Sequence, residues 1–361
     1  MSYQIILNLR EMYFFLIRFL LRLHYSTVDG APALQFAKPY LLIRGLAFLP
    51  SLISLIGFSA FRGVMDTITP LKISLFANLF NIILDPLLIF KAKMGVTGAA
   101  LASLSAEFIS ALTFAYVLWK RNMIKGSKLL KLPSWSQLSP LLKAGAALQL
   151  RNFSLNVTFL AVTRVTQSID KTGVAAAAHA LAIQTFQLGG IVLLALSTVA
   201  QIVVPSELVE RIDPVTGVKS GGIHACKSAV NRLMSWGLIL GVILGGLQVL
   251  FLPLLNKATP LIEVRQAAMV PSYLASAYQI INGLVFIGEG VMIGTGNFWQ
   301  LSVNTFIATL ATLWALRTFP SVYGLTGIWM SFGVFNTIRL LGVLKHQLYT
   351  SPIARVQIAK Q

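Results

Sequence analysis

Nine apolar segments, each long enough to cross a bilayer as a helix, constrain this chain more than any other feature. They lie at about 40–60, 70–90, 96–118, 142–163, 174–204, 228–254, 268–294, 300–317 and 322–344. A spanning helix needs about 20 predominantly apolar residues. The 361 residues are 56% hydrophobic and only 11% charged, whereas a soluble domain carries about a quarter charged residues. The sequence therefore predicts an all-α, multi-pass membrane protein.

The net charge of +18 fits orientation in a membrane better than nucleic-acid binding. If the spans cross alternately, one set of loops holds 15 lysines and arginines, and the other set holds only Lys91, Lys93, Lys171, Lys257, Arg265 and Arg317. An excess of basic residues marks the cytosolic side or its topological equivalent. No helix-turn-helix pattern or aromatic-interleaved basic element accompanies the charge. We expect the bilayer as a partner, no nucleic acid, and a monomeric chain.

The sequence shows no pattern that indicates an enzyme. It has no glycine-rich phosphate loop, no His-Glu-x-x-His helix and no Cys/His metal spacing. Its single cysteine, Cys226, excludes a disulfide framework and a thiolate metal cluster. We therefore expect no catalytic residues, no metal and no cofactor.

An internal repeat relates residues 40–100 to residues 273–333. The first unit contains FRGVMDTITP at 61–70 and ends in GVTGAALAS at 95–103, while the second contains MIGTGNFWQL at 292–301 and ends in YGLTGIWMSFG at 323–333. Overlaying Gly63 on Gly294 and Gly95 on Gly324 gives offsets of 231 and 229 residues. Each unit has three predicted spans running in the same sense, so the pattern indicates a duplication.

The repeat exposes a difference at the N-terminus. Three spans precede the second unit, but the run MYFFLIRFLLRLHY before the first is short and interrupted by Arg18 and Arg22. We expect a six-plus-six architecture without about its first three spans, through a shortened gene model or a truncation, with an organelle-targeting segment as the alternative. The predicted parts are an irregular or partial segment 1–38, the remainder of the first lobe 39–120, a cytosolic linker 121–141, a six-helix lobe 142–345 and a tail 346–361.

Five motifs in order resemble the multidrug and toxic compound extrusion (MATE) transporters, and in particular their DinF-type branch with plant and algal members. They are RGVMDTITP at 62–70, NIILDPLLIF at 81–90, GVTGAALAS at 95–103, AAAAHALAIQTFQL at 175–188 and FIGEGVMIGTGNF at 286–298. The resemblance covers about residues 39–345. It implies a MATE-like bundle, here of about nine helices, from two lobes related by a pseudo-two-fold axis. The family's first three helices, including an acidic residue on the first, have no counterpart in this chain.

The resemblance also implies a function. It predicts an antiporter that exports organic cations, drugs or organic anions against a proton or sodium gradient by alternating access. The membrane is either the plasma membrane or the plastid envelope. Two alternatives remain open: a lipid-linked sugar flippase of the same superfamily, and a truncated chain that acts as a non-transporting partner.

Three acids inside the predicted spans are candidates for ion coupling: Glu289, Asp85 and Glu107. A carboxylate at the centre of a spanning helix costs about 2.5–3.5 kcal/mol, so it faces a cavity or a partner. Gaining or losing a proton there changes the charge and shifts the balance of conformations. By the resemblance, Glu289 matches an acidic position of the tenth family helix. The alternatives are that Glu289 snorkels, Asp85 braces the kink at Pro86, and Glu107 pairs with a local base.

A second group of polar residues is predicted to line a substrate cavity: Arg151, Asn152, Asn156, Gln184, Gln187 and Asn282. Arg151 either holds an anionic substrate or pairs with an acid inside the protein. Gln184 and Gln187 are three residues apart and are expected to share a helix face. His179 is expected to cap or pack rather than relay protons.

The segment RGVMDTITP predicts a helix start. Asp66 and Thr67 are residue types that cap helix N-termini, and Pro70 is tolerated in a first turn. We expect a capped connection between two spans there.

Overall fold

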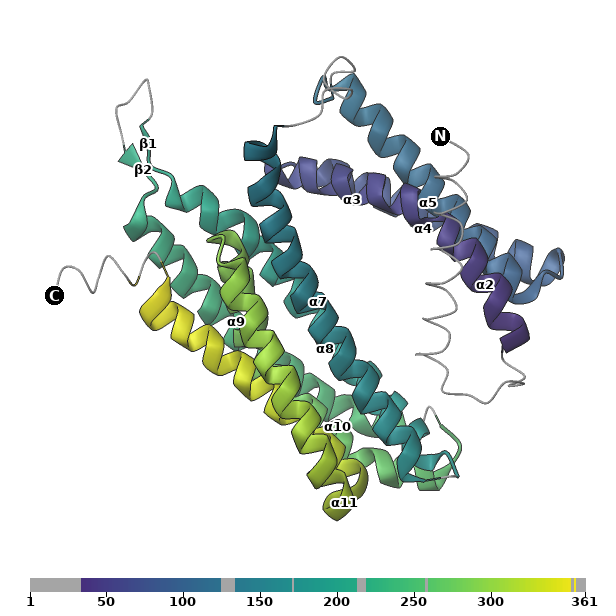
Figure 1. The fold of residues 1–361 in the computed structure, drawn as a ribbon. Coiled ribbons are helices and arrows are strands. Elements are labelled where there is room, and N and C mark those ends of the chain that lie inside the picture. The colour runs from purple at the N-terminus through teal and green to yellow at the C-terminus, as the bar shows by residue number, and fades with distance from the viewer. Residues whose placement is uncertain are drawn as a thin grey trace. The chain divides into compact units, whose positions relative to one another are not determined.

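The computed structural model describes residues 34–124, 134–170, 172–212, 219–256, 259–351 and 354. The chain divides into two compact units, residues 1–132 and 133–361, and each is described by itself. Nine α-helices, two short π-helices and one two-stranded ribbon make up the described part (Figure 1). The prediction of an all-α fold is confirmed, although the two-residue strands were not foreseen. Most of the predicted segment 1–38 lies outside the described residues.

The first unit is built around helix α5 (Gly95–Lys120). Helices α2 (Leu34–Leu46), α3 (Phe48–Gly63) and α4 (Ile68–Pro86) all pack against it, as does the π-helix η1 (Leu87–Lys91). The core is small and centres on Phe61, Ile73, Phe114 and Leu118. Helices α2 and α3 meet at Ala47 with a bend of 47°, which falls inside the predicted span 40–60.

Asp66 caps α4 as predicted, whereas Thr67 makes no side-chain cap bond. One Asp66 oxygen accepts the backbone N–H groups of Ile68 and Thr69, and the other accepts the Thr69 hydroxyl at 2.7 Å. Arg121 at the end of α5 donates to the same carboxylate at 2.6 Å. The bonds from the Thr69 backbone and hydroxyl, and then Arg121, hold the pKa of Asp66 below its ordinary value. The connection therefore ties α4 to α5.

Helix α4 changes character at Pro86. The α-helix ends there and the π-helical turn η1 follows directly. Proline has no N–H to donate, so the carbonyls one turn earlier lose their partner and the helix rewinds locally. Asp85 lies immediately before this change.

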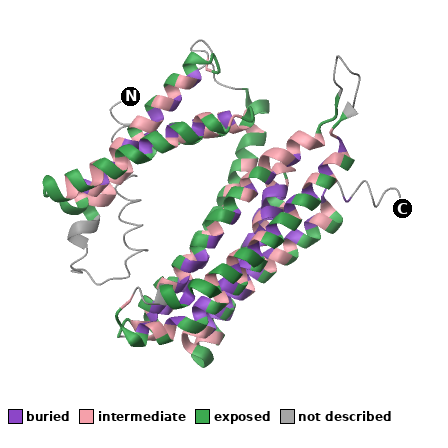
Figure 2. Cartoon of the chain, turned by 180° about the vertical axis from the view of Figure 1, so that it is seen from behind, coloured by how far each residue is buried: buried purple, intermediate pink, exposed green. Residues whose placement is uncertain are grey.

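The second unit contains five long helices and is more deeply packed. These are α7 (Trp135–Ile169), α8 (Val174–Leu208), α9 (Ile223–Asn256), α10 (Ile262–Gly294) and α11 (Phe298–Lys345), with strands β1 (Arg211–Ile212) and β2 (Lys219–Ser220) between α8 and α9. Helix α10 packs against α8, α9 and α11, and α11 packs against α7. Buried residues concentrate along α10 and α11 (Figure 2). Hence α10 is the central helix of this unit.

Helix α11 contains the two predicted spans 300–317 and 322–344. Its continuity is broken at Gly324, whose backbone has φ 55° and ψ −131°. Only glycine adopts that conformation without strain. The chain turns back on itself at this break, so the two predicted spans lie side by side (Figure 1), and Asn304 Nδ2 in the first donates to the Arg339 backbone oxygen in the second at 3.2 Å.

Two boundaries differ from the sequence expectation. Helix α7 begins at Trp135, inside the predicted linker 121–141, because Ser134 and Gln137 form a capping box. The predicted tail 346–361 begins with a packed π-helical turn, η2 (His346–Thr350), in which His346 is buried and contacts the Gln300 and Thr350 side chains. Both ordered elements depend on side-chain hydrogen bonds that hydropathy does not reveal.

In the part of the chain that the structure describes, six helical segments are long and apolar enough to cross a membrane, or seven if the bent pair α2–α3 counts as one span. This is fewer than the nine predicted spans for two reasons. Segment 298–350 is counted once, although it holds two of the predicted spans. Helix α7 carries Lys143, Arg151 and Arg164 among several amides, so its apolar content is too low for the same criterion.

Candidate functional site

Glu289 on α10 is the centre of a buried cluster of three charges. Its side chain is 2% exposed. One carboxylate oxygen lies 2.5 Å from Nη2 of Arg151 on α7, and the other lies 2.8 Å from Nε of Arg339 on α11. The cluster therefore joins three helices that are far apart in the sequence. The alternative in which Arg151 pairs with an acid inside the protein is the arrangement that the structure shows.

The two glycines beside Glu289 allow neighbouring helices to approach. A Cβ on Gly288 would overlap Val343 of α11, and a Cβ on Gly290 would overlap Ser197 of α8. Both glycines thus leave room for a close approach of α10 to its neighbours. They let α10 lie close enough to its neighbours for the carboxylate to reach the arginines.

Arg339 was not identified from the sequence as a site residue. Its guanidinium lies over the rings of Phe286 and Phe335, at 5.7 and 5.1 Å from their centroids, and Nη1 faces Asn336 Oδ1 at 3.4 Å. The residue is 5% exposed. The sequence offered the same reason to select Arg339 as to select Glu289. Each is a charged side chain within a predicted span, 322–344 for Arg339 and 268–294 for Glu289.

The cluster carries an excess positive charge. Two guanidinium groups face one carboxylate, and no further acid among the described residues forms an ion pair with either arginine. Arg151 is the less committed of the two: its side chain is 19% exposed, and its Nε makes no hydrogen bond. An additional anion at Arg151 would balance the charge.

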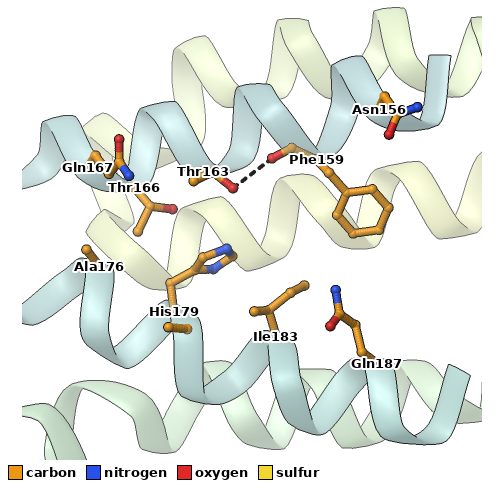
Figure 3. A pocket seen from close by; sticks show the side chains of 10 residues that line it. Asn156, Phe159, Thr163, Thr166, Gln167, Ala176, His179, Ile183 and Gln187 are labelled. Carbon is orange, nitrogen blue, oxygen red and sulfur yellow. Dashed lines mark hydrogen bonds between the residues drawn. The ribbon is translucent and has the colours of Figure 1, made fainter. Parts of the chain in front are cut away.

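A cavity of about 520 Å³ lies between α7 and α8 (Figure 3). Its volume falls in the usual range for small-molecule sites. Its lining residues are Asn156, Phe159, Thr163, Thr166 and Gln167 from α7, and Ala176, His179, Ala180, Ile183 and Gln187 from α8. The structure thus brings two predicted substrate-cavity residues, Asn156 and Gln187, into one cavity. The lining contains no aspartate, glutamate, lysine or arginine, and His179 is its one titratable side chain.

The other predicted cavity residues lie elsewhere. Asn152 accepts a bond from Asn156 through its backbone oxygen and faces Arg151 Nη1 at 3.5 Å. Gln184 is exposed and does not line the cavity, although it is only three residues from Gln187. Asn282 is fully buried on α10, and neither of its amide atoms has a hydrogen-bond partner. It also lies outside the cavity lining.

In the first unit, Glu107 on α5 pairs with a base. It lies 2.7 Å from Arg44 of α2, and the Ser51 hydroxyl donates to its other oxygen. This matches the local-partner alternative for Glu107. The pair borders a cavity of about 390 Å³ whose polar lining includes Ser54, Ser74, Asn78 and Ser110.

Asp85 differs from the other two intramembrane acids because one of its oxygens is free. Its Oδ1 is buried without a hydrogen-bond partner, and so is Nδ2 of Asn81. The two residues are four apart on α4 and share a helix face. A buried carboxylate oxygen without a partner is a place for a proton or a cation.

The sequence of this chain is similar to those of known proteins along most of its length. The MatE family profile matches residues 5–87, so the likeness begins earlier than the predicted residue 39. Protein DETOXIFICATION 44, chloroplastic, of Arabidopsis thaliana is 28% identical over 84% of this chain and 56% of its own. Protein DETOXIFICATION 43 of the same plant is 27% identical over 90% of this chain and 59% of its own. The chain thus spans little more than half the length of these relatives.

Solved structures share the fold. A structure described as MATE in the bent conformation matches 92% of this chain and 72% of its own, with a TM-score of 0.77 and 18% identity. MATE transporters of the MOP superfamily in outward-facing and inward-facing conformations match with TM-scores of 0.78 and 0.70, both at 17% identity. They cover 98% and 96% of this chain, and this chain covers 77% of each. With its helical fold, intramembrane charges and sequence relatives taken together, this chain is a multi-pass membrane protein that is similar in sequence and fold to MATE transporters.

Proposed function

We propose that this chain acts in secondary active efflux, exporting organic cations, drugs or organic anions against a proton or sodium gradient by alternating access. The observation that carries the proposal is the set of charged groups inside the helices, Asp85 and Glu289 with its two arginines, in a fold that MATE transporters share. That fold is found in both outward-facing and inward-facing structures. A protein with two such states can be driven between them by an ion that binds them unequally.

For ion coupling we place Asp85 first among the three acids. Its free oxygen beside Asn81 can take up a proton or sodium ion without breaking an existing ion pair. Glu289 and Glu107 are already held by arginines, so they couple only if transport separates these pairs. A Glu289 locked permanently against Arg151 and Arg339 would not couple at all.

For anionic substrates we propose Arg151 as the binding group. It carries the excess charge of the cluster and has an unused Nε donor. A substrate carboxylate there would form a charge-assisted hydrogen bond. Arg151→Ala should therefore weaken transport of anions more than that of cations, and an equal loss for both would indicate a purely structural pair.

Counterflow in vesicles containing the purified chain tests the proposal. Ethidium serves as the cationic probe and benzoate as the anionic probe, each with a proton or sodium gradient imposed. Gradient-dependent movement of either probe supports efflux, while movement of a lipid-linked sugar alone would identify a flippase. If ethidium, benzoate and the lipid-linked sugar all fail to move, the remaining interpretation is a chain that acts as a non-transporting partner.

The coupling residue is tested in the same vesicles. Asp85→Asn removes the titratable group but keeps the shape, so exchange without a gradient should persist while stimulation by the gradient is lost. If gradient stimulation survives Asp85→Asn and disappears in Glu289→Gln, the order of the two acids is reversed.

A further inference from the structure

His179 is the buried polar group in the α7–α8 cavity that the proposed function does not use. It is 7% exposed and lines the cavity, and its Nδ1 has no hydrogen-bond partner. In Figure 3 its ring projects from α8 toward Thr163 and Thr166 on α7. A buried polar atom without a partner loses the hydrogen bonds it had in water. A ligand in this cavity can supply the missing bond.

The ring of His179 is held in place from behind. Trp329 of α11 lies 5.7 Å from it, centroid to centroid, and is in turn packed against Phe186 and Phe332. Trp329 is 1% exposed, and its own Nε1 also lacks a partner. This aromatic cluster fixes the imidazole plane, so His179 presents the same polar edge to the cavity.

The cavity lining is unsuited to a charged ligand. None of its lining residues is aspartate, glutamate, lysine or arginine, and Arg151 and Glu289 are not among them. An ion in a low-dielectric site requires an opposite charge or several strong hydrogen bonds. The cavity therefore favours an uncharged ligand.

The polar atoms of α7 that face the cavity are mainly acceptors. Thr163 and Thr166 donate their hydroxyl protons to the backbone oxygens of Phe159 and Val162, at 2.9 and 2.8 Å. Asn156 donates to the Asn152 backbone oxygen. Hydroxyl and amide oxygens retain lone pairs that can accept further bonds. Together with the side chains of Phe159 and Ile183, they match a flat apolar ligand that carries a donor.

We propose that the α7–α8 cavity binds an uncharged aromatic compound bearing an O–H or N–H donor, and that His179 is its specificity-determining residue. This ligand class goes beyond the charged substrates of the proposed function and rests on it for a role in transport. Binding itself is measurable without transport. The two ideas can therefore fail separately.

The experiment measures binding to the purified full chain in lipid nanodiscs by isothermal titration at neutral pH. The four probes are 4-methylphenol, its O-methyl ether, 4-hydroxybenzoate and phenyltrimethylammonium. They provide a neutral donor, a neutral compound without the phenol donor, an anion and a cation. We expect the phenol to bind about tenfold more tightly than its ether, the size of one good hydrogen bond, and more tightly than both charged probes.

Variants then assign the donor's partner. His179→Phe keeps a ring against Trp329 but removes both nitrogens, so it should abolish the preference for the phenol over its ether. His224→Phe is the matched control, because His224 is exposed on α9 and outside the cavity. If His179→Phe does not fold, Thr163→Val offers a second test at an exposed lining position. It should weaken the phenol several-fold and leave the ether unchanged.

Three results would overturn the inference. They are equal affinity for the phenol and its ether in the wild-type chain, tighter binding of a charged probe, and a phenol preference that survives His179→Phe. Absence of saturable phenol binding at millimolar concentration counts against it in the same way. Counterflow of ethidium or benzoate alongside any of these results would leave the proposed efflux function standing.

Discussion

At the scale of single residues, the balance of charge around Glu289 governs what a substitution there does. The sequence alone suggests that Glu289→Gln keeps the shape and leaves folding intact. The structure shows two arginines that depend on this carboxylate, one of them 5% exposed. A glutamine cannot neutralise either guanidinium. Glu289→Gln is therefore expected to destabilise the fold, an effect that the sequence position alone does not indicate.

Glu289→Gln should lower the free energy of unfolding by about 3–5 kcal/mol, the usual cost of removing one partner from a buried ion pair. Thermal unfolding of the purified protein in detergent measures the loss as a lower Tm. Glu263→Gln is the matched control, because Glu263 lies in the exposed first turn of the same helix. An unchanged Tm for Glu289→Gln would show that the ion pairs do not stabilise the folded chain.

A double-mutant cycle separates the two arginines. Adding Arg339→Gln to Glu289→Gln removes one of the two orphaned charges, so the double variant should be more stable than the sum of the single losses predicts. The same cycle with Arg151→Gln should show a smaller coupling energy, because Arg151 is more exposed than Arg339. Additive losses in both cycles would contradict the observed pairing.

At the scale of secondary-structure elements, helix ends and breaks depend on individual side chains. The α3–α4 connection is held by Asp66, whose pKa is lowered chiefly by the Thr69 bonds. The break in α11 depends on the positive φ of Gly324. Each feature can be tested by a substitution that changes one element and leaves the cavity residues in place.

Asp66→Ala should lower the Tm at neutral pH and have less effect in acid. A carboxyl whose folded pKa is depressed stabilises the fold above its unfolded pKa, about 3.9. That stabilisation is lost as the pH falls through the lower, folded pKa. The difference in Tm between wild type and variant should be full at pH 7 and shrink below about pH 4. A difference that stays constant to pH 3 would mean that the carboxylate charge is not involved.

Gly324→Ala should destabilise the chain by about 1–3 kcal/mol, because a Cβ strains this backbone conformation. Gly246→Ala in α9 is the control, since its backbone is helical and the site for a Cβ is open. Alanine favours a helix over glycine, so the control should be neutral or slightly stabilising. Comparable Tm values for the two variants would argue against a required break at residue 324.

At the scale of the whole molecule, the distribution of basic residues predicts its orientation in the bilayer. Lys93 and Lys120 lie at opposite ends of α5, are exposed, and belong to the two different sets of loops. The only cysteine, Cys226, is fully buried and suits a background for labelling. Orientation is therefore accessible to a simple chemical test.

In intact cells, an impermeant maleimide should label Lys93→Cys, and it should reach Lys120→Cys only after permeabilisation. The wild-type chain, with Cys226 alone, is the control and should remain unlabelled. This outcome follows from placing the more basic loops in the cytosol. The reverse pattern would invert the assigned topology, and labelling of both variants from outside would exclude a span between them.

The sequence by itself indicated an all-α membrane protein and its resemblance to MATE transporters. Hydropathy depends only on the local run of side chains, and the motifs around Asp66, Gly95 and Glu289 are contiguous. The Gly324 break and the Asp66 cap could also be predicted, because each depends on residues within a few positions. The sequence also marked Glu289 as requiring a partner or a cavity.

Only the tertiary structure decided which partner each polar group has. Glu289 meets Arg151 and Arg339, which are 138 and 50 residues away in sequence, and no local pattern shows that these two arginines are its partners. Gln187 reaches the cavity while Gln184 does not, because the rotation of α8 is set by its packing on α10. Such choices depend on how whole helices pack against one another. Local sequence patterns do not encode these helix rotations and interhelical contacts.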